Sequence, residues 1–289
     1  MPVFNLFGHR TISPAWDYKV PGLLWRLVPT ESGLLVGEER DVERKRTGFF
    51  CVYQSTGELL WQSSDFEEQW WIGIESTHRD RLFLHGYATP DMPLHMGITA
   101  VDLFTGKRVW RRPDLKFLAT TGESVFASRD VGENRVVLEV RISDGELLCE
   151  IDVNDKRFKE DITQTETHPT DAPIMPRPID VTDEVDQRTI RLIHGHINSW
   201  KVVGQVESLV RNGLLVFSFH ERMGNASEGH LRNLLGIIDV NSGGRVWSET
   251  LNRDVRSIAP ESFFVHGAML FYVKERTTLV AMNLDNLHI

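Results

Sequence analysis

The stretch that decides the fold is AVDLFTGKRVW, residues 100–110. Apolar and polar residues alternate in its first half, a polar turn ends at Gly106, and Trp110 stands four residues after that glycine. Alternation with a period of two is typical of a half-buried strand, and a short glycine turn between two such runs is typical of a β-hairpin. The stretch therefore predicts two antiparallel strands joined by a tight turn.

The same pattern recurs along the chain. Three further copies are CVYQSTGELLW (51–61), EVRISDGELLC (139–149) and IIDVNSGGRVW (237–247), and their turn glycines are Gly57, Gly145 and Gly243. A weaker copy, IRLIHGHINSW (190–200), has His196 in place of the turn glycine. We therefore expect His194 and His196 in a hairpin turn.

The spacing of the copies predicts the architecture. The closing bulky residues lie 39 to 51 residues apart, at Trp16, Trp61, Trp110, Cys149, Trp200 and Trp247. This period is typical of the blades of a β-propeller. We expect an all-β chain, a six-bladed β-propeller of four-stranded antiparallel blades forming a single domain over 1–289. The approximate units are 17–61, 62–110, 111–149, 150–200, 201–247, and 248–289 plus 1–16.

Two parts of this prediction need separate mention. The strand around Trp16 is expected to complete the C-terminal blade, which would close the ring and remove exposed sheet edges. Whether the unit 150–200 forms a complete blade is left open, because Pro173, Pro176 and Pro178 interrupt any strand ladder there.

Composition excludes several classes of function. The 289 residues carry 32 Lys and Arg against 41 Asp and Glu, a net charge of −9, and nucleic acids and anionic membrane surfaces both require a basic footprint. No apolar stretch approaches the length of a membrane helix. Cys51 and Cys149 are far apart in the sequence, and no signal peptide is recognisable, so we expect a cytoplasmic protein without disulfides.

The repeat is similar to that of the PQQ-like, or quinoprotein-like, β-propellers, whose blades carry an ALD-x-x-TG-x-x-x-W signature. The matching residues are Asp102, Thr105, Gly106 and Trp110, then Thr56, Gly57 and Trp61, then Asp239, Gly243 and Trp247. The chain also resembles small uncharacterised bacterial propellers. The resemblance implies a Trp that docks between neighbouring blades.

The same resemblance bears on cofactors. Many members of the superfamily bind no quinone and act as scaffolds. Its quinone-dependent members are larger or secreted, and they use a stacking Trp, a calcium site and often a vicinal disulfide. This chain has no adjacent cysteines and no recognisable calcium loop. We therefore expect no cofactor, and in particular no PQQ.

Candidate site residues come from four segments interpreted as long loops on one face: 38–46, 85–97, 176–188 and 220–233. Loops at the mouth of a propeller usually meet the ligand. The expected ligand or partner contacts are His85, Tyr87, His95, His220, Arg222 and His230. The four histidines among them are also candidate metal ligands. The alternative is that they are ordinary solvated residues.

A second repeated feature is acidic. The phrases PTES, GIES, TQTET, QVES and APES place carboxylates near the presumed innermost strands, at Glu31, Glu75, Glu166, Glu207 and Glu261. If they face the central channel, they are candidate axial metal ligands. The alternative is a repeated turn in which Glu and Ser bind the backbone.

Two local patterns carry further expectations. Of Trp70 and Trp71, we expect one to enter the core and the other to face a blade interface or solvent, where an exposed Trp would indicate a binding surface. The mixed charges of 38–46 are interpreted as a solvated loop.

The leading functional hypothesis is a non-catalytic propeller scaffold that binds a protein or a small polar ligand through its long loops. The alternative is a metal-assisted hydrolase or lyase that uses histidines at the central funnel, and a third possibility is a structural subunit of a larger assembly. No GxSxG, HExxH or phosphate-binding glycine loop is present, so no catalytic residue is assigned.

Overall fold

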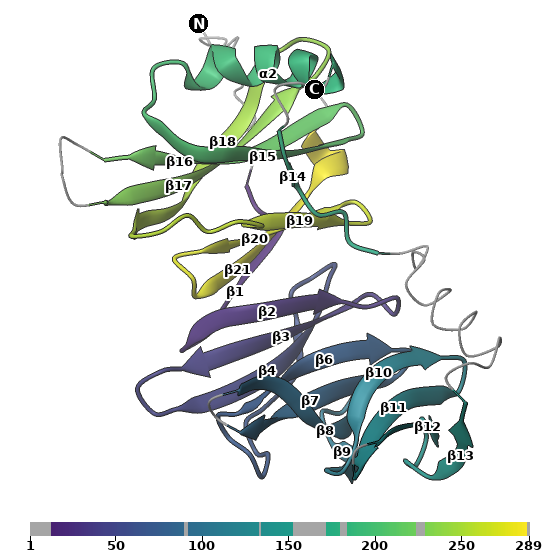
Figure 1. Cartoon of the computed structure of the whole chain (residues 1–289). Coiled ribbons are helices and arrows are strands. Elements are labelled where there is room, and N and C mark those ends of the chain that lie inside the picture. Colours follow the sequence, from purple (N-terminus) through teal and green to yellow (C-terminus); the bar gives the residue numbers. More distant parts are fainter. Residues whose placement is uncertain are drawn as a thin grey trace, which may run out of the picture. The chain divides into compact units, whose positions relative to one another are not determined.

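A computed structural model of the chain describes residues 13–89, 92–132, 134–152, 172–179, 184–223 and 229–287. In this part of the chain, the strands form five antiparallel sheets, as Figure 1 shows. The prediction of an all-β chain is therefore confirmed. The described residues group into two compact units, one between Lys19 and Ala172 and the other formed by residues up to Tyr18 with those from Pro173 onward.

The unit between Lys19 and Ala172 contains three four-stranded sheets. Each sheet is a meander in which strands consecutive in sequence are neighbours in space. The strands are β2 (Leu23–Pro29), β3 (Leu34–Asp41), β4 (Arg46–Tyr53), β5 (Leu59–Ser63); β6 (Ile72–His78), β7 (Arg81–Thr89), β8 (Met92–Asp102), β9 (Arg108–Arg112); and β10 (Lys116–Thr121), β11 (Ser124–Val131), β12 (Asn134–Arg141), β13 (Leu147–Ile151).

The other unit contains two sheets. One has the order β14 (Arg177–Pro178), β15 (Val202–Arg211), β16 (Leu214–Arg222), β17 (Leu231–Asp239), β18 (Arg245–Val255). The other has the order β1 (Trp16–Lys19), β21 (Thr278–Asn283), β20 (Met269–Lys274), β19 (Phe263–His266), and a short 3-10 helix, η1 (Leu284–Leu287), follows it. The strand around Trp16 thus pairs with the C-terminal sheet, and Ala15 N–H donates to the carbonyl of Ala281 at 2.8 Å.

The hairpin predicted over 190–200 is wrong. Residues of that stretch belong to helix α2 (Glu184–Ile197), so His194 and His196 lie on a helix and not in a turn. Ile190, Ile193 and Ile197 recur at the spacing of an amphipathic helix. Trp200 lies just beyond the helix end and is not a strand anchor.

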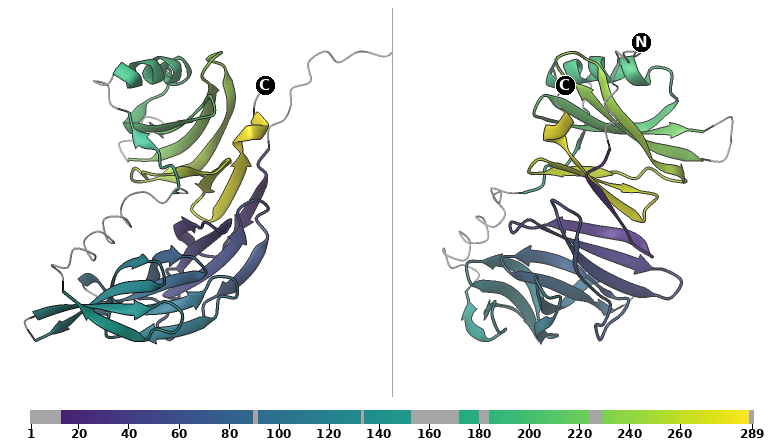
Figure 2. Two further views of the ribbon diagram at one scale, coloured as in Figure 1. Left: turned by 90° about the vertical axis from the view of Figure 1, so that its right-hand side faces the viewer. Right: turned by 180° about the vertical axis from the view of Figure 1, so that it is seen from behind.

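Helix α2 covers one face of the β15–β18 sheet, as Figures 1 and 2 show. Buried Ile193 packs with Leu215, Phe217 and Phe219 of β16. No four-stranded sheet lies within the described part of the unit predicted over 150–200, and residues 153–171 and 180–183 lie outside the description. The described part of this unit, which the prolines already marked as a poor match to a blade, therefore contains a helix.

One hydrogen bond recurs in all five sheets. Counting the strands of each meander from β2, β6, β10, β15 or β19, the backbone N–H just after the third strand donates to a carbonyl in the turn that joins the first two strands, over 2.8–2.9 Å. The donors are Gln54, Leu103, Ile142, Val240 and Leu284, and the acceptors are Gly33, Asp80, Glu123, Gly213 and Ala268, respectively. The bond ties the turn after the third strand to the neighbouring turn at the same end of its own sheet.

The predicted docking of tryptophan between neighbouring sheets is observed in the unit between Lys19 and Ala172. Trp61 of β5 donates its indole N–H to the carbonyl of Leu103 at 2.7 Å, and Trp110 of β9 donates to the carbonyl of Ile142 at 2.7 Å. Each acceptor belongs to a residue whose N–H makes the recurring bond. The Trp side chain therefore joins one sheet to the fixed turn of the next.

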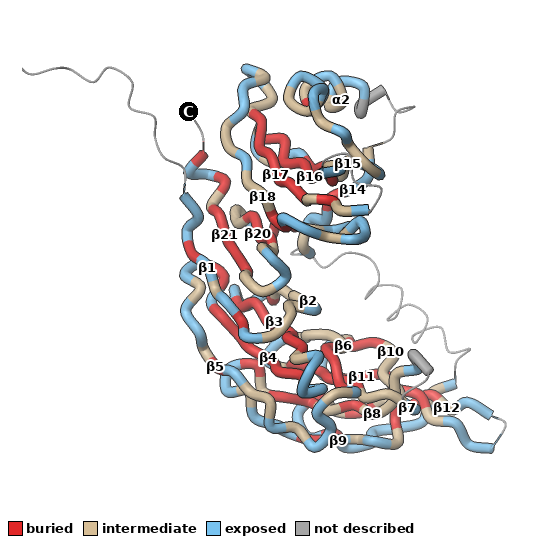
Figure 3. The backbone as a smooth tube through the Cα atoms, turned by 90° about the vertical axis from the view of Figure 1, so that its left-hand side faces the viewer, coloured by how far each residue is buried: buried red, intermediate tan, exposed pale blue. Residues whose placement is uncertain are grey.

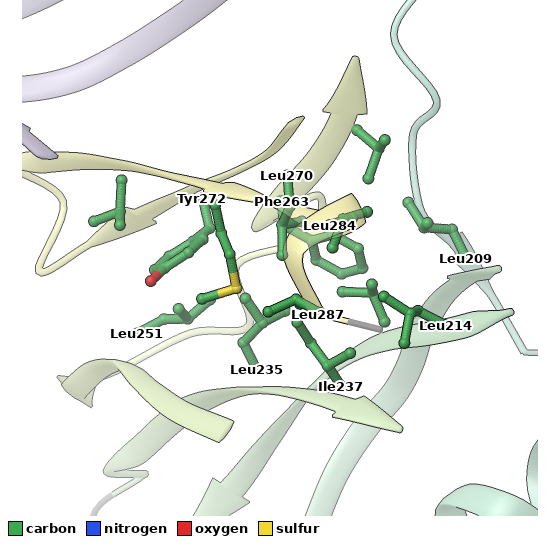
Figure 4. Close-up of a cluster of buried hydrophobic side chains, with 14 residues drawn as sticks. Leu209, Leu214, Leu235, Ile237, Leu251, Phe263, Leu270, Tyr272, Leu284 and Leu287 are labelled. Atoms are coloured by element: carbon green, nitrogen blue, oxygen red, sulfur yellow. The ribbon is translucent and has the colours of Figure 1, made fainter. Parts of the chain in front are cut away.

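Hydrophobic side chains fill the space between successive sheets. One buried cluster joins the β2–β5 and β6–β9 sheets, a second joins β6–β9 and β10–β13, and a third, drawn in Figure 4, joins β15–β18 to β19–β21. Figure 3 shows that buried residues follow the middle strands, whereas the outer strands β5 and β9 are largely accessible. Burial of apolar area between sheets is thus the main source of stability within each unit.

The turn glycine under the docked Trp allows a direct test. Gly106 has φ +69°, and a Cβ atom there would lie 2.6 Å from the Trp61 ring; Gly33 has φ +75° and nothing within 4 Å of its Cβ position. Alanine at either position has about 1–2 kcal/mol of backbone strain. We expect Gly106→Ala to lose a further ~1–3 kcal/mol in urea unfolding, because the ring must move. Equal losses in Gly106→Ala and Gly33→Ala would show that Trp61 does not pack as described.

Candidate functional site

Three of the predicted site residues come together on one hairpin. Segment 85–97 is not a long loop: most of it belongs to β7 and β8, where Tyr87 and His95 are paired directly opposite each other. The ring centroids of His85 and His95 are 3.4 Å apart and their planes meet at 78°. Tyr87 lies 5.2 Å from the His85 ring and 5.6 Å from the His95 ring, centroid to centroid. Residues two apart on a strand share a face, which explains why His85 and Tyr87 meet.

Glu75 joins this group from the neighbouring strand β6. The pairing of β6 with β7 shifts between Ile74 and Ser76, so Glu75 is the extra residue of a β-bulge. A bulge redirects its side chain relative to the regular strand. The Oε2 atom of Glu75 lies 2.8 Å from Nδ1 of His95 and 3.3 Å from Nδ1 of His85. We call Glu75, His85 and His95 the imidazole–carboxylate cluster.

His85 is the buried member of the cluster. Only 6% of its side chain is exposed, and its Nδ1 atom has no hydrogen-bond partner. Burial, together with the nearby His95, Arg26 and Arg40, lowers the pKa of His85 to about 3. The ring is therefore neutral at physiological pH, and its free nitrogen faces a carboxylate oxygen.

Segment 38–46 is a solvated loop only in part, since residues 42–46 are exposed but residues 38–40 are not. Glu38, Glu39 and Arg40 are buried residues of β3. The Nε atom of Arg40 donates to Glu38 Oε1 at 2.8 Å, and its two terminal nitrogens donate to the carbonyls of Trp70 and Ile72 at 2.8 and 2.9 Å. Charged residues are buried here because each finds a partner.

Glu38 and Arg26 complete the connection to β6. The second carboxylate oxygen of Glu38 accepts the N–H of Ile74 at 3.0 Å, and Arg26 donates to the carbonyl of Ile74 at 2.6 Å. Both bonds reach the strand residue that precedes Glu75. The bulge is therefore held from the neighbouring sheet.

Aromatic side chains extend the site across the same two sheets. The guanidinium of Arg40 lies 5.3 Å from the ring centroid of Trp25 and 5.2 Å from that of Trp70. The chain of contacts continues from Trp70 to Trp71 at 6.3 Å and from Trp71 to Tyr87 at 5.8 Å. We call Trp25, Trp70, Trp71 and Tyr87 the aromatic row. The prediction that Trp70 or Trp71 enters the core is wrong, since Trp70 is half-buried and Trp71 is exposed.

The remaining predicted contacts belong to the other compact unit. His220 is buried in β16, and its Nε2 atom accepts the N–H of Ala259 at 3.1 Å. His230 pairs with Asp254 at 2.7 Å, and Arg222 is an exposed residue at the end of β16. Residues 220–222 and 231–233 of the predicted loop belong to β16 and β17, and residues 224–228 lie outside the description. His220 and His230 each have a local partner that accounts for them.

The five repeated glutamates do not occupy equivalent positions. Glu31 is exposed in the turn between β2 and β3, and Glu75 is the bulge residue of β6. Glu207 lies in β15, where its carboxylate accepts the N–H of Glu261 at 2.9 Å, and Glu261 itself precedes β19. Burial raises the pKa of Glu207. Glu166 lies outside the described residues.

A separate hollow of about 700 Å³ lies between α2 and β15. Its volume is in the range of small-molecule sites. The lining is mostly aliphatic, from Ile179, Ile190, Ile193, Ile197 and Val206, with His194 and Gln205 as polar side chains. Among the described residues of the predicted segment 176–188, Pro178 and Ile179 contribute to it, and the described lining offers no converging set of titratable groups.

Comparison with known proteins adds no activity. Residues 28–110 match the model of a domain of unknown function, DUF4905, and this match includes the aromatic row except Trp25, together with the whole imidazole–carboxylate cluster. A search of the curated proteins finds no match. No helix in the described ranges is long and apolar enough to cross a membrane.

Solved structures give distant likenesses. They include a quinohemoprotein alcohol dehydrogenase from Pseudomonas putida HK5 (9% identity, 94% of this chain and 44% of that chain, TM-score 0.31). A second is the Swd1 β-propeller domain of Myceliophteria thermophila (12% identity, 89% of this chain and 68% of that chain, TM-score 0.32). A third is the uncharacterized protein lmo1340 from Listeria monocytogenes EGD-e (10% identity, 89% of this chain and 94% of that chain, TM-score 0.34). The chain thus spans under half the length of the dehydrogenase, and TM-scores this low carry no argument about fold or function.

The buried ion pair gives a first prediction for the site. Replacing Arg40 with alanine leaves Glu38 buried without its cation and removes the donors to two carbonyls. We expect Arg40→Ala to lower the free energy of unfolding by about 3–5 kcal/mol. Arg44→Ala is the matched control, because Arg44 pairs with Asp41 at the surface and should change stability little. Urea unfolding of both variants measures this, and equal losses would contradict the role given to Arg40.

His220 gives a prediction on pH. Burial lowers its pKa, and a protonated Nε2 could not accept the Ala259 N–H. The unfolded chain takes up this proton near pH 6.5, before the folded chain does. The stabilising contribution is therefore complete above about pH 6.5 and is lost as the pH falls through the lowered pKa of the folded state.

We expect unfolding free energy to fall more steeply from about pH 7.5 to about pH 5 in the unmodified protein than in His220→Gln. The control is His230→Gln, which removes a surface imidazole and should keep most of the original slope. The free energy of unfolding is measured with urea at both pH values. If it falls by the same amount in all three proteins, His220 does not titrate as described.

Proposed function

We propose that this chain is a non-catalytic binding protein of the β-propeller type, which holds a protein partner against the aromatic row. The propeller assignment is supported by the repeated four-stranded meander, the recurring hydrogen bond of each sheet, and the Trp that docks onto the next sheet. The pairing of β1 with β21 supports ring closure. The count of six blades stays a prediction, and a sixth blade would need strands outside the described residues.

The observation that carries the binding role is the exposure of large aromatic side chains that are nonetheless held in place. Trp25 is 61% exposed and Trp71 is 37% exposed. Trp side chains on rigid surfaces are typical of the energetic centres of protein interfaces, because they bury much area and lose little conformational entropy. An exposed row of this kind is a surface prepared for a partner.

The row is rigid because of what lies beneath it. Arg40 contacts Trp25 on one side and Trp70 on the other, and it is itself fixed by Glu38 and two backbone carbonyls. Preorganisation of this kind improves affinity, since fewer rotamers are lost on binding. The histidine-based hydrolase or lyase is not part of the proposal, because His220 and His230 have partners of their own.

The test compares three baits. The unmodified protein, the double variant Trp25→Ala/Trp71→Ala, and Val131→Ala are each immobilised and exposed to extract of the native cell. Val131 is the matched control, a 51% exposed apolar residue at the end of β11, away from the row in sequence. Circular dichroism and urea unfolding confirm that the baits are folded.

We expect a protein retained by the unmodified bait and by Val131→Ala to be lost from the double variant. With the retained protein purified, calorimetry should show Kd raised at least about tenfold in the double variant, because interface centres contribute more than 1 kcal/mol each. Retention that is the same on all three baits would refute the aromatic row as the binding surface.

A further inference from the structure

We infer that Glu75, His85 and His95 form a binding site for a divalent late transition-metal ion, with Zn²⁺ as the reference ion. The inference concerns the same face as the proposed function but does not rest on it, because metal binding is measured on the isolated protein. It begins from the placement of three donor atoms. One ligand atom from each residue lies within 4.8 Å of the other two, and this is the one such group of three found in the described part of the chain.

The distances suit a small tetrahedral ion. With metal–ligand bonds of about 2.0–2.1 Å, tetrahedral donors lie about 3.3–3.4 Å apart. Glu75 Oε2 lies 3.3 Å from His85 Nδ1 and 2.8 Å from His95 Nδ1. The first distance fits directly, and the second requires the half-exposed His95 to withdraw by about half an ångström. The three donors come from three successive strands, β6, β7 and β8, and lie close enough to surround one ion.

An independent observation points to a ligand. The Nδ1 atom of His85 is buried and has no hydrogen-bond partner, although it faces the Glu75 carboxylate. A buried polar atom left unpaired destabilises the folded state. The facing Oε2 atom is already hydrogen-bonded with His95 Nδ1 at 2.8 Å. A cation between the three atoms would satisfy His85 Nδ1 and the carboxylate together.

The electrostatic surroundings allow this. The two nearby cations are engaged elsewhere: Arg40 pairs with Glu38, and Arg26 donates to the carbonyls of Ile74 and Glu75. Glu75 thus retains its carboxylate oxygens for the cluster.

The surroundings also position the ligands. Gly73 leaves room for His85, since a Cβ atom there would lie 2.6 Å from His85 Nε2. Tyr87 packs against both imidazoles, and the hydrogen bonds to Ile74 hold the bulge that directs Glu75. Neighbours that orient ligands in this way are a regular part of metal sites.

The donor set selects the class of metal. Two imidazole nitrogens and one carboxylate oxygen suit Zn²⁺, Co²⁺ or Ni²⁺, whereas Mg²⁺ and Ca²⁺ prefer oxygen ligands alone. Three protein ligands leave one position of a tetrahedral ion for water or a partner's side chain. His95 is 41% exposed, so solvent reaches the cluster at this residue.

The test uses the full chain produced without a histidine tag and freed of metal by chelation. Calorimetric titration with Zn²⁺ should give one site per chain. Added Co²⁺ should give the intense visible absorption bands of a tetrahedral ion bound by nitrogen and oxygen. Zn²⁺ should then displace the Co²⁺ and remove these bands. An excess of Mg²⁺ should not compete.

Variants locate the site. Glu75→Gln and His95→Ala should each weaken Zn²⁺ binding at least about tenfold and remove the Co²⁺ bands. They are preferred to a change at buried His85, and unfolding curves confirm that they fold. His230→Ala is the matched control, a half-exposed histidine paired with a carboxylate in the other compact unit, and it should bind as the unmodified protein does.

Binding that is absent in the unmodified protein, or unchanged in both Glu75→Gln and His95→Ala, overturns the inference. Loss of binding in His230→Ala alone would also overturn it. None of these results alters the expected effect of Trp25→Ala/Trp71→Ala on partner retention, so failure of the metal site and failure of the proposed function can be told apart.

Discussion

The indole N–H bond from Trp61 to Leu103, repeated from Trp110 to Ile142, is the interaction on which the unit between Lys19 and Ala172 depends. Each acceptor residue is held by its own N–H to the turn between the first two strands of its sheet. Successive sheets are therefore joined through backbone that is already fixed, and the apolar clusters between them pack in one arrangement. The positions of β3, β6 and β7 that form the candidate site follow from this arrangement.

The other unit replaces this device with a helix. Gly243 occupies the turn position that Gly106 and Gly145 occupy elsewhere, yet Leu192 of α2 lies over it and His196 hydrogen-bonds with its carbonyl oxygen at 3.0 Å. The sequence pattern of the glycine turn is the same in both cases. What covers the turn differs. At Gly243 a helix lies over the turn, whereas at Gly106 and Gly145 a Trp of the preceding sheet lies over it.

Much of the fold could be predicted because its signals are local. Alternation, turn glycines and the spaced Trp residues identify the strands of 51–61, 100–110 and 237–247. The helix was missed because Ile190, Leu192 and Ile197 can be fitted to a strand as well as to a helix over so short a stretch. Glu38 and Arg40 were missed for another reason: burial of charge depends on a partner that a single sequence does not reveal. The candidate site was found in part, since His85, Tyr87, His95 and Glu75 were named, but the bulge that brings Glu75 to the imidazoles leaves no distinctive mark in GIES.

The pairing of β1 with β21 has a consequence for how the chain is made. The partner strands lie near opposite ends of the described chain, so β1 leaves the ribosome long before the strand it pairs with exists. During synthesis Trp16 and its neighbours must stay unpaired or bind transiently elsewhere, and contacts of such long sequence separation form slowly. The β19–β21 sheet can therefore reach four strands only after β21 has been synthesised, and a ribosome-stalled chain that ends before β21 would present β1 to chaperones or proteases.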